Sequence, residues 1–174
     1  PSPLPPELDS KVKKFFFPPV LQPILHGGHL YAVPTEYQLY ALGYNTRVWA
    51  EAGMVDPPKT WTELKQMALK GTQRYPDGSV ERIGLRFSGI DWAAGGEGET
   101  HTYISFLWSN NGEYIDETGR PGFDSVEALE TMEFLTEMVR TEVAYADGWG
   151  GLANGDSFMA IIPSWSRNSL RDAM

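Results

Sequence analysis

Apolar and polar positions along this chain follow two alternating patterns, one typical of strands and one typical of helices. Short apolar runs over residues 30–33 and 39–44 predict β-strands, and the second run has the composition of a strand covered on both faces. Residues 83–87 and 159–163 indicate two further strands. Because helical patterns separate these runs, the sequence predicts an α/β fold with a sheet flanked by helices.

Helix starts are marked by capping residues. Asn45 is placed to cap a short helix that ends before Gly53. Thr60 and Glu63 form a capping-box pattern, in which the hydroxyl and the carboxylate satisfy amides of the first helical turn. A helix is also expected over residues 100–110.

A further helix is expected to begin at Asp124 or Ser125 and to present one apolar stripe to the sheet. The stripe consists of Ala128, Met132, Leu135 and Val139. This spacing predicts a structural helix that packs by these four side chains.

Composition excludes several classes of function. The net charge of −9 and the 14 scattered Lys and Arg residues argue against nucleic acid and against an anionic membrane surface as partners. The absence of cysteine excludes disulfides and thiolate metal sites. The longest apolar runs are far shorter than the ~20 residues that span a bilayer. The proline-rich residues 1–29 show no export signal, so we expect a cytoplasmic protein or one whose signal has been removed.

Three adjoining segments carry a resemblance to a known family: residues 31–45, residues 46–53 and residues 57–64. They resemble the middle of extracellular solute-binding proteins of ABC importers, of the maltodextrin-binding and sugar-binding type (family 1). The resemblance covers about residues 27–174, and it implies that the chain is a fragment, since members are about twice as long or more.

The resemblance implies one lobe of a two-lobed, periplasmic-binding-protein-like (type II) fold with a mixed sheet. Residues 1–29 would then be a poorly ordered lead-in segment and residues 30–174 the ligand-binding lobe. The implied function is capture of a sugar or oligosaccharide in the cleft between lobes, for import through a membrane permease. We expect a monomer without cofactor or catalysis, located in the periplasm or outside the cell, where a lipoprotein anchor is one form of attachment.

Aromatic rings and a few polar groups are what a neutral sugar requires of its site, because its C–H faces stack on rings and its hydroxyls need fixed partners. The candidate ligand-binding residues are Glu36, Tyr37, Gln38, Trp92, Tyr103 and Trp165. Trp165 follows the last strand, where the family has a sugar-stacking tryptophan. The sequence departs from the family pattern beside it, with Leu152 where a phenylalanine is usual and Pro163-Ser164 where Gly-Pro is usual.

Other chemistries remain as alternatives. A glycoside-active enzyme would use Asp91, Glu97 and Glu99 as paired carboxylates. Two histidines, His26 and His29, are too few for a metal site, and His101 is equally isolated. A third alternative is a non-sugar solute. For an anionic one, only three arginines lie near the proposed cleft, which favours a neutral ligand. They are Arg47, Arg86 and Arg167.

Overall fold

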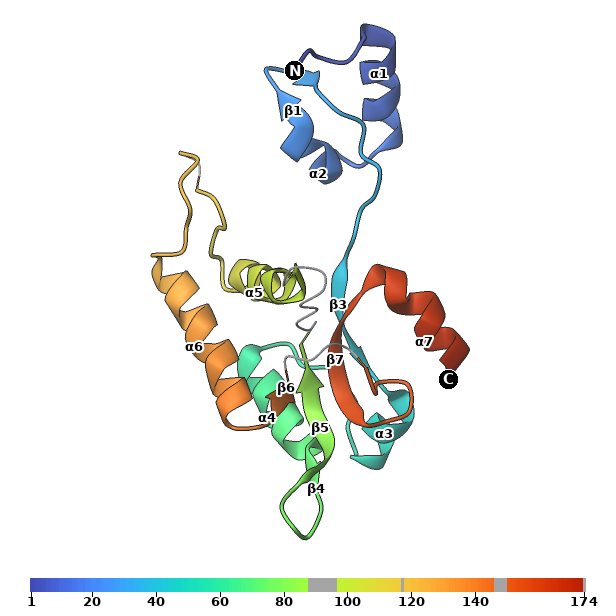
Figure 1. Cartoon of the computed structure of the whole chain (residues 1–174), viewed down its shortest axis with the longest axis vertical. Helices are drawn as coiled ribbons and strands as arrows, with labels where there is room; N and C mark the ends of the chain where they lie inside the picture. Colours follow the sequence, from blue (N-terminus) through green and yellow to red (C-terminus); the bar gives the residue numbers. More distant parts are fainter. Residues whose placement is uncertain (88–96, 117, 146–149, 174) are drawn as a thin grey trace. The chain divides into compact units, whose positions relative to one another are not determined.

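The computed structural model describes residues 1–87, 97–116, 118–145 and 150–173, and it divides into two compact units. Unit 1 is Pro1–Leu39 and unit 2 is Tyr40–Met174 (Figure 1). The division falls after Leu39, whereas the sequence suggested a boundary after residue 29. The assignment of residues 30–174 to one lobe of the parent protein stays a prediction.

Unit 1 is built around a small apolar core of Val12, Leu21 and Leu30. Its elements are α1 (Pro6–Phe15), α2 (Pro18–Leu21), the 3₁₀ helix η1 (Gln22–Ile24), β1 (Leu25–His26) and β2 (His29–Leu30). The buried carboxylate of Asp9 on α1 accepts a hydrogen bond from the Leu30 amide at 2.8 Å and pairs with Lys13 at 2.6 Å. These contacts join α1 to β2.

The segment with His26 and His29 is a β-hairpin. The two histidines face each other across β1 and β2, and the turn between them is Gly27-Gly28. Both glycines have positive φ, +55° and +81°, as a two-residue hairpin turn requires. The strand predicted over residues 30–33 is therefore wrong in extent, because β2 ends at Leu30 after pairing back onto β1.

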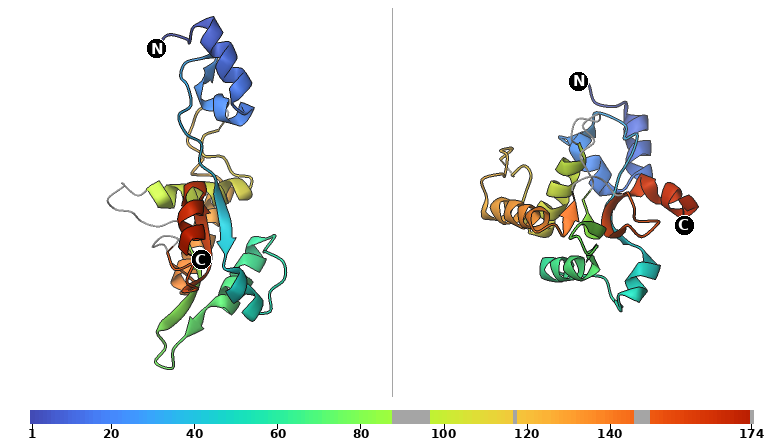
Figure 2. Two further views of the ribbon diagram at one scale, coloured as in Figure 1. Left: turned by 90° about the vertical axis from the view of Figure 1, so that its right-hand side faces the viewer. Right: turned by 60° about the horizontal axis from the view of Figure 1, so that its bottom comes forward.

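Unit 2 is a mixed sheet with helices around it, as predicted. Its strands are β3 (Tyr40–Tyr44), β4 (Gln73–Arg74), β5 (Val80–Arg86), β6 (Ala144–Tyr145) and β7 (Ser157–Pro163). The order is β3-β7-β5-β4, with β6 also paired to β5. β7 runs antiparallel to β3 and parallel to β5. β4 and β5 form a hairpin that projects from one end of the sheet (Figures 1 and 2).

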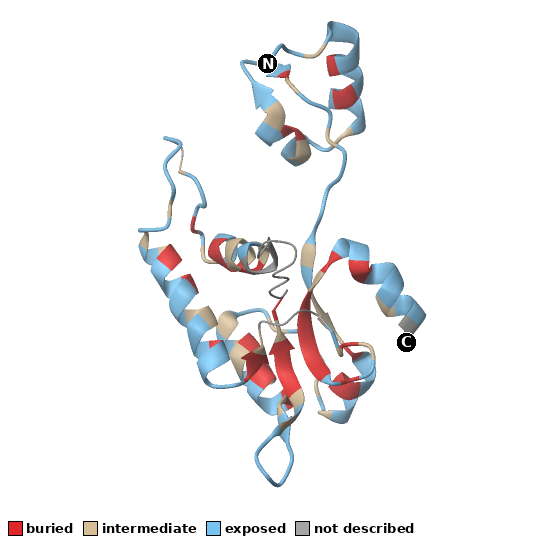
Figure 3. Ribbon diagram, viewed as in Figure 1, coloured by how far each residue is buried: buried red, intermediate tan, exposed pale blue. Residues whose placement is uncertain are grey.

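The two central strands form the buried middle of unit 2, which Figure 3 shows in red on β5 and β7. Every residue of β7 except Ile162 is buried, so the strand is covered on both faces. The Trp49 ring stacks on Phe158 with centroids 5.0 Å apart. The predicted buried strand before Trp165 is thus confirmed.

Local capping places the helices α3 (Thr46–Glu51) and α4 (Trp61–Gly71) as the sequence predicts. The Asn45 side chain accepts from the amides of Arg47 and Val48, and it also donates to the carbonyl of Leu152. Thr60 and Glu63 form both hydrogen bonds of the capping box. Asn45 therefore ties the start of α3 to the loop that leads into β7.

Helices α5 (Glu97–Ser109) and α6 (Val126–Arg140) pack against each other, and η3 (Ser164–Ser166) and α7 (Arg167–Ala173) follow β7. Ser125 caps α6 by accepting from the Ala128 amide at 3.1 Å, which selects it over Asp124 as the cap. The helix predicted over residues 100–110 is confirmed, with its start three residues earlier.

The predicted inward stripe of α6 is wrong at two of its four positions. Met132 and Val139 are exposed, whereas Thr131 and Met138 are buried beside Ala128. The helix is rotated toward Thr131 because its hydroxyl donates to the Glu127 carbonyl at 2.7 Å, which lets a polar residue be buried. The outer face of α6 consequently carries apolar residues.

Candidate functional site

The carboxyl edge of the sheet in unit 2 is the candidate ligand site. β5 and β7 are parallel, so their carboxyl ends lie at the same edge, where open α/β sheets bind ligands. β3 is antiparallel to β7, and its first residue, Tyr40, pairs there with Pro163. We call this region the carboxyl edge, comprising Tyr40, His101, Pro163 and Trp165.

A ring stack closes one side of the carboxyl edge. The imidazole of His101 on α5 lies over the Tyr40 ring, with centroids 4.8 Å apart and an angle of 23° between the planes. Both residues are half-buried. Sequence reasoning missed this pair, since it considered His101 only as an isolated metal ligand. No local signal connects two residues 61 positions apart, although Tyr40 lies inside the segment that carries the family resemblance.

Trp165 lies on the 3₁₀ turn that follows β7, and 58% of its surface is exposed. The buried Ser166 hydroxyl donates to the Pro163 carbonyl at 2.7 Å, which fixes the turn on both sides of the tryptophan. The sequence predicted a tryptophan exposed at the end of a buried strand, and this placement is confirmed. Its contact with a ligand stays a prediction.

The predicted residues before β3 belong to unit 1. Glu36, Tyr37 and Gln38 are exposed in a segment without helix or strand, directly ahead of Tyr40. The Gln38 amide donates to the Glu36 carboxylate at 2.8 Å, and 55% of the Tyr37 surface is exposed. These three side chains are available for a ligand, and their role stays a prediction.

Tyr103 lies on a different side of α5. It follows His101 by two residues, which places the two rings about 200° apart around the helix. Its ring packs near Phe123, with centroids 6.1 Å apart, and Phe123 in turn meets Tyr114 edge-on at 5.2 Å. Desolvation raises the pKa of the Tyr103 phenol above 10.0. Trp92, another predicted residue, lies outside the described residues.

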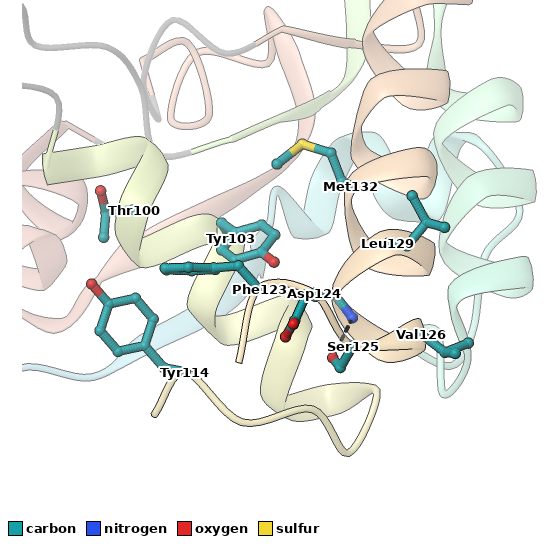
Figure 4. Close-up of a pocket in the computed structure, with 10 residues that line it drawn as sticks. Thr100, Tyr103, Tyr114, Phe123, Asp124, Ser125, Val126, Leu129 and Met132 are labelled. Atoms are coloured by element: carbon teal, nitrogen blue, oxygen red, sulfur yellow. Dashed lines mark hydrogen bonds between the residues drawn. The ribbon is translucent and has the colours of Figure 1, made fainter. Parts of the chain in front are cut away.

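Two cavities in unit 2 differ in size. The one beside the carboxyl edge, between β3, α5 and β7, has a volume of about 180 Å³, which is below the ~300–1,000 Å³ of typical ligand pockets. The other, about 770 Å³, lies between α5 and the start of α6, and Figure 4 shows Tyr103 and Phe123 side by side in it. The cavity beside the carboxyl edge is thus too small to enclose a ligand of typical size.

Two of the three arginines considered for an anionic ligand are engaged within unit 2. Arg47 pairs with Glu51 at 3.0 Å, and Arg86 donates to the Ser157 hydroxyl at 2.8 Å. Arg167 is exposed two residues beyond Trp165. The charge arrangement therefore offers one cation next to the exposed tryptophan.

The described residues bear on the metal alternative and not on the enzyme alternative. These residues contain no group of three His, Cys, Asp or Glu side chains that could hold a metal ion. The described helices also include none with the length and apolar character needed to cross a bilayer. For the enzyme alternative, Asp91 and the side chains of Glu97 and Glu99 lie outside what the structure describes.

Comparison with known proteins gives the family. The bacterial extracellular solute-binding protein family matches residues 1–171. A maltotriose-binding protein of Pyrococcus abyssi is 28% identical over 164 residues, which are 91% of this chain and 32% of that protein.

Solved structures show the fold. A solute-binding protein from Thermotoga lettingae bound with α-D-tagatose superposes with a TM-score of 0.77 at 24% identity, covering 99% of this chain and 45% of that one. UgpB from Mycobacterium tuberculosis, in complex with glycerophosphocholine, gives a TM-score of 0.71 at 18% identity, covering 99% of this chain and 44% of that one. The predicted periplasmic-binding-protein-like fold is confirmed, and the chain spans less than half the length of these relatives.

Proposed function

The chain belongs to the bacterial extracellular solute-binding protein family, and from this premise we propose that it forms part of the substrate-binding component of an ABC importer for a neutral sugar or oligosaccharide. The solute is bound at the carboxyl edge and is released unchanged. The maltotriose-binding and tagatose-bound relatives support the choice of a carbohydrate.

The observation that carries this proposal is the aromatic character of the carboxyl edge. Trp165 offers an exposed ring at the end of β7, and the Tyr40–His101 stack offers a second aromatic wall at the start of β3. Aromatic rings bind the C–H faces of sugars, and the His101 imidazole and the Tyr40 hydroxyl can hydrogen-bond to the rim. We propose these residues as ligand contacts, together with Glu36, Tyr37, Gln38 and Trp92.

The open edge predicts weak binding by this chain alone. A disaccharide of about 23 heavy atoms at ~0.3 kcal/mol per atom reaches ~7 kcal/mol, a dissociation constant near 10 μM. If the second lobe supplies half of the contacts, ~3.5 kcal/mol remains, which corresponds to a low-millimolar constant. A micromolar constant for the 174-residue chain would contradict this division of contacts between lobes.

The proposal is tested by replacing one tryptophan at a time. We expect Trp165→Ala to weaken binding of maltose or maltotriose about tenfold, because the ring that stacks on the sugar is lost. Trp108→Ala is the matched control, since Trp108 is 63% exposed and lies seven residues, or about 10 Å, along α5 from His101. Ligand titration by NMR measures dissociation constants in the millimolar range. A circular dichroism spectrum that matches that of the parent chain is the control for the folding of both variants. Equal affinity of the two variants would remove Trp165 from the site.

The proposed role in import determines which partner and which location we expect. The proposed partner is a membrane permease of an ABC importer, which recognises the closed, ligand-bound protein. We propose a periplasmic or extracellular monomer, with lipoprotein anchoring as one form of attachment.

A non-sugar, anionic solute is the second candidate, and Arg167 is the observation that favours it. This exposed arginine follows Trp165 by two residues, and a protein of similar fold was solved with glycerophosphocholine. Affinity for a glycerophosphodiester that falls steeply with added salt and is lost in Arg167→Met would support this candidate. Salt-independent binding of a neutral sugar would support the main proposal.

A further inference from the structure

The sequence contains two Asn-Gly pairs, and the structure describes both. Asn111-Gly112 follows α5, and Asn154-Gly155 lies in the loop before β7. In such a pair the glycine amide nitrogen can attack the side-chain carbonyl of the asparagine, because the two groups lie in one short segment and glycine has no Cβ to obstruct the approach. Both pairs are therefore candidates for deamidation, a spontaneous covalent modification.

Asn111 is the left-handed residue of a Schellman motif that ends α5. Its φ is +59°, its amide donates to the Trp108 carbonyl at 3.1 Å, and the Gly112 amide donates to the Leu107 carbonyl at 2.9 Å. The Asn111 side chain is exposed, and within the described part of the chain it has no hydrogen bond. The bond from Gly112 to Leu107 is thus the contact that holds the attacking nitrogen back.

This bond belongs to the end of a helix, where local opening costs little free energy. The turn is tied to α6 by the Asn110 side chain, which donates to the Glu127 carbonyl at 3.2 Å and to the Glu130 carboxylate at 2.9 Å. Gly112 itself is buried. The reaction in the folded chain therefore waits for the turn to open and is slower than in an unfolded chain.

Asn154 is held at both polar atoms of its side chain. Its Nδ2 donates to the Asp156 carboxylate at 2.7 Å, and its Oδ1 accepts from the Asp156 amide at 3.3 Å. The Gly155 amide donates to the Gly151 carbonyl at 3.0 Å, and the Gly155 carbonyl accepts from the Arg82 guanidinium at 2.8 Å. The loop is thereby fixed to β5, and Asn154 reacts only after several contacts are lost together.

We propose that Asn111 is the deamidation site of the folded chain and that the turn at Asp156 protects Asn154. The Gly112 nitrogen gives its proton to solvent and bonds to Cγ of Asn111, and the bond from Cγ to Nδ2 breaks with release of ammonia. Water then opens the resulting five-membered imide at either carbonyl, which leaves aspartate or isoaspartate. The sum is one water consumed and one ammonia released, and it is independent of which solute binds at the carboxyl edge.

Either product changes the end of α5. Aspartate adds a negative charge two residues before Glu113, in a chain whose net charge is already −9. Isoaspartate adds one carbon to the main chain between Asn111 and Gly112, so the two amides can no longer meet the Trp108 and Leu107 carbonyls with Schellman geometry.

Peptide mapping measures both sites in one sample. Trypsin cleaves after Arg86, Arg140 and Arg167, so the two asparagines fall in different peptides, and mass spectrometry follows their conversion in warm, mildly alkaline buffer. In the folded 174-residue chain we expect Asn111 to convert at least about fivefold faster than Asn154. In concentrated urea both should convert faster and at rates within about twofold of each other, since the fold no longer distinguishes them.

Two variants separate the parts of the proposal. Asn111→Gly keeps a residue that accepts positive φ and should abolish conversion in its peptide without changing Asn154. Asp156→Ala removes the carboxylate that holds the Asn154 amide, so Asn154 should convert about threefold faster in the folded chain relative to its rate in urea, while Asn111 is unchanged.

Several results would overturn the proposal. One is an Asn154 rate in the folded chain that equals or exceeds the Asn111 rate, and another is the same ratio of rates in urea, which would assign the preference to local sequence. Conversion that persists in Asn111→Gly would assign the reaction to Asn110. An Asn154 rate that does not change in Asp156→Ala, or an Asn111 that stays intact while the urea sample converts, would count equally against it.

Discussion

Gly84 of β5 lies directly against the backbone carbonyl of Ala68 on α4, with no space between them for a methyl group. Ala68 is fully buried in the main core of unit 2. The Ala68 carbonyl belongs to the backbone and cannot swing away as a side chain could. A Cβ at position 84 would therefore push α4 away from the sheet.

We therefore expect Gly84→Ala to destabilise unit 2 by about 2–3 kcal/mol, since α4 would have to shift away from β5. Urea denaturation followed by circular dichroism measures the change. Gly150→Ala is the control, because a Cβ there would meet no atom within 4 Å. A loss below about 1 kcal/mol for Gly84→Ala would mean that the helix moves at little cost.

The Thr60 capping box offers a second test of stability. Thr60→Ala removes the hydroxyl that accepts from the Glu63 amide at 3.1 Å, so the first turn of α4 loses one of its two caps. We expect a loss of about 1 kcal/mol in the free energy of unfolding. Thr62→Ala, in the same turn but exposed, should change stability by less than about 0.5 kcal/mol. Equal effects of the two substitutions would assign the loss to helix propensity.

These two examples also mark what the sequence could predict. The capping box of α4 and the cap at Asn45 involve residues within three positions of each other, so their pattern is visible in the sequence. The exposure of Trp165 follows similarly from a buried strand that ends at a proline and a serine. Local chemistry decides all three.

The rotation of α6 and the His101–Tyr40 stack could not be predicted in this way. The buried position of Thr131 depends on its hydroxyl, which donates a hydrogen bond to the backbone of the same helix. A count of apolar residues treats Thr131 as polar and therefore places it on the outer face. The stack joins α5 to β3 and depends on how a whole helix packs on the sheet. The sequence also selected Tyr103, whose ring the structure places in the cavity between α5 and the start of α6.

Asp9 provides a prediction for pH. A hydrogen bond from Lys13, and then one from the Leu30 amide, hold the pKa of this carboxyl below its ordinary value of 3.8. A carboxyl whose pKa is lower in the folded state stabilises unit 1 fully above its unfolded value, and this stabilisation is lost as the pH falls through the folded value. We expect the Leu30 amide resonance to follow this titration with a midpoint below 3.8.

Removing the larger cause should shift that midpoint upward. Lys13→Met keeps the aliphatic stem and removes the ammonium group, so the Asp9 pKa should rise toward 3.8. Lys11→Met changes the neighbouring charge without touching Asp9 and serves as control. A Leu30 midpoint that is the same in Lys13→Met as in the parent chain would show that the Lys13 ammonium group is not a cause of the lowered pKa.

Two faces of α5 carry aromatic rings, one at the carboxyl edge and one in the cavity between α5 and the start of α6. His101 faces Tyr40 at the carboxyl edge and Tyr103 faces Phe123, so truncating each to alanine removes a ring from one region only. We expect His101→Ala to weaken binding of a neutral oligosaccharide about tenfold, because one aromatic wall and a hydrogen-bonding group are lost together. Tyr103→Ala should change the affinity by less than about twofold, although it removes more apolar surface. NMR titration of both variants with maltotriose measures the difference, and a greater loss in Tyr103→Ala would move the sugar from the edge of the sheet to the side of α5 that faces α6.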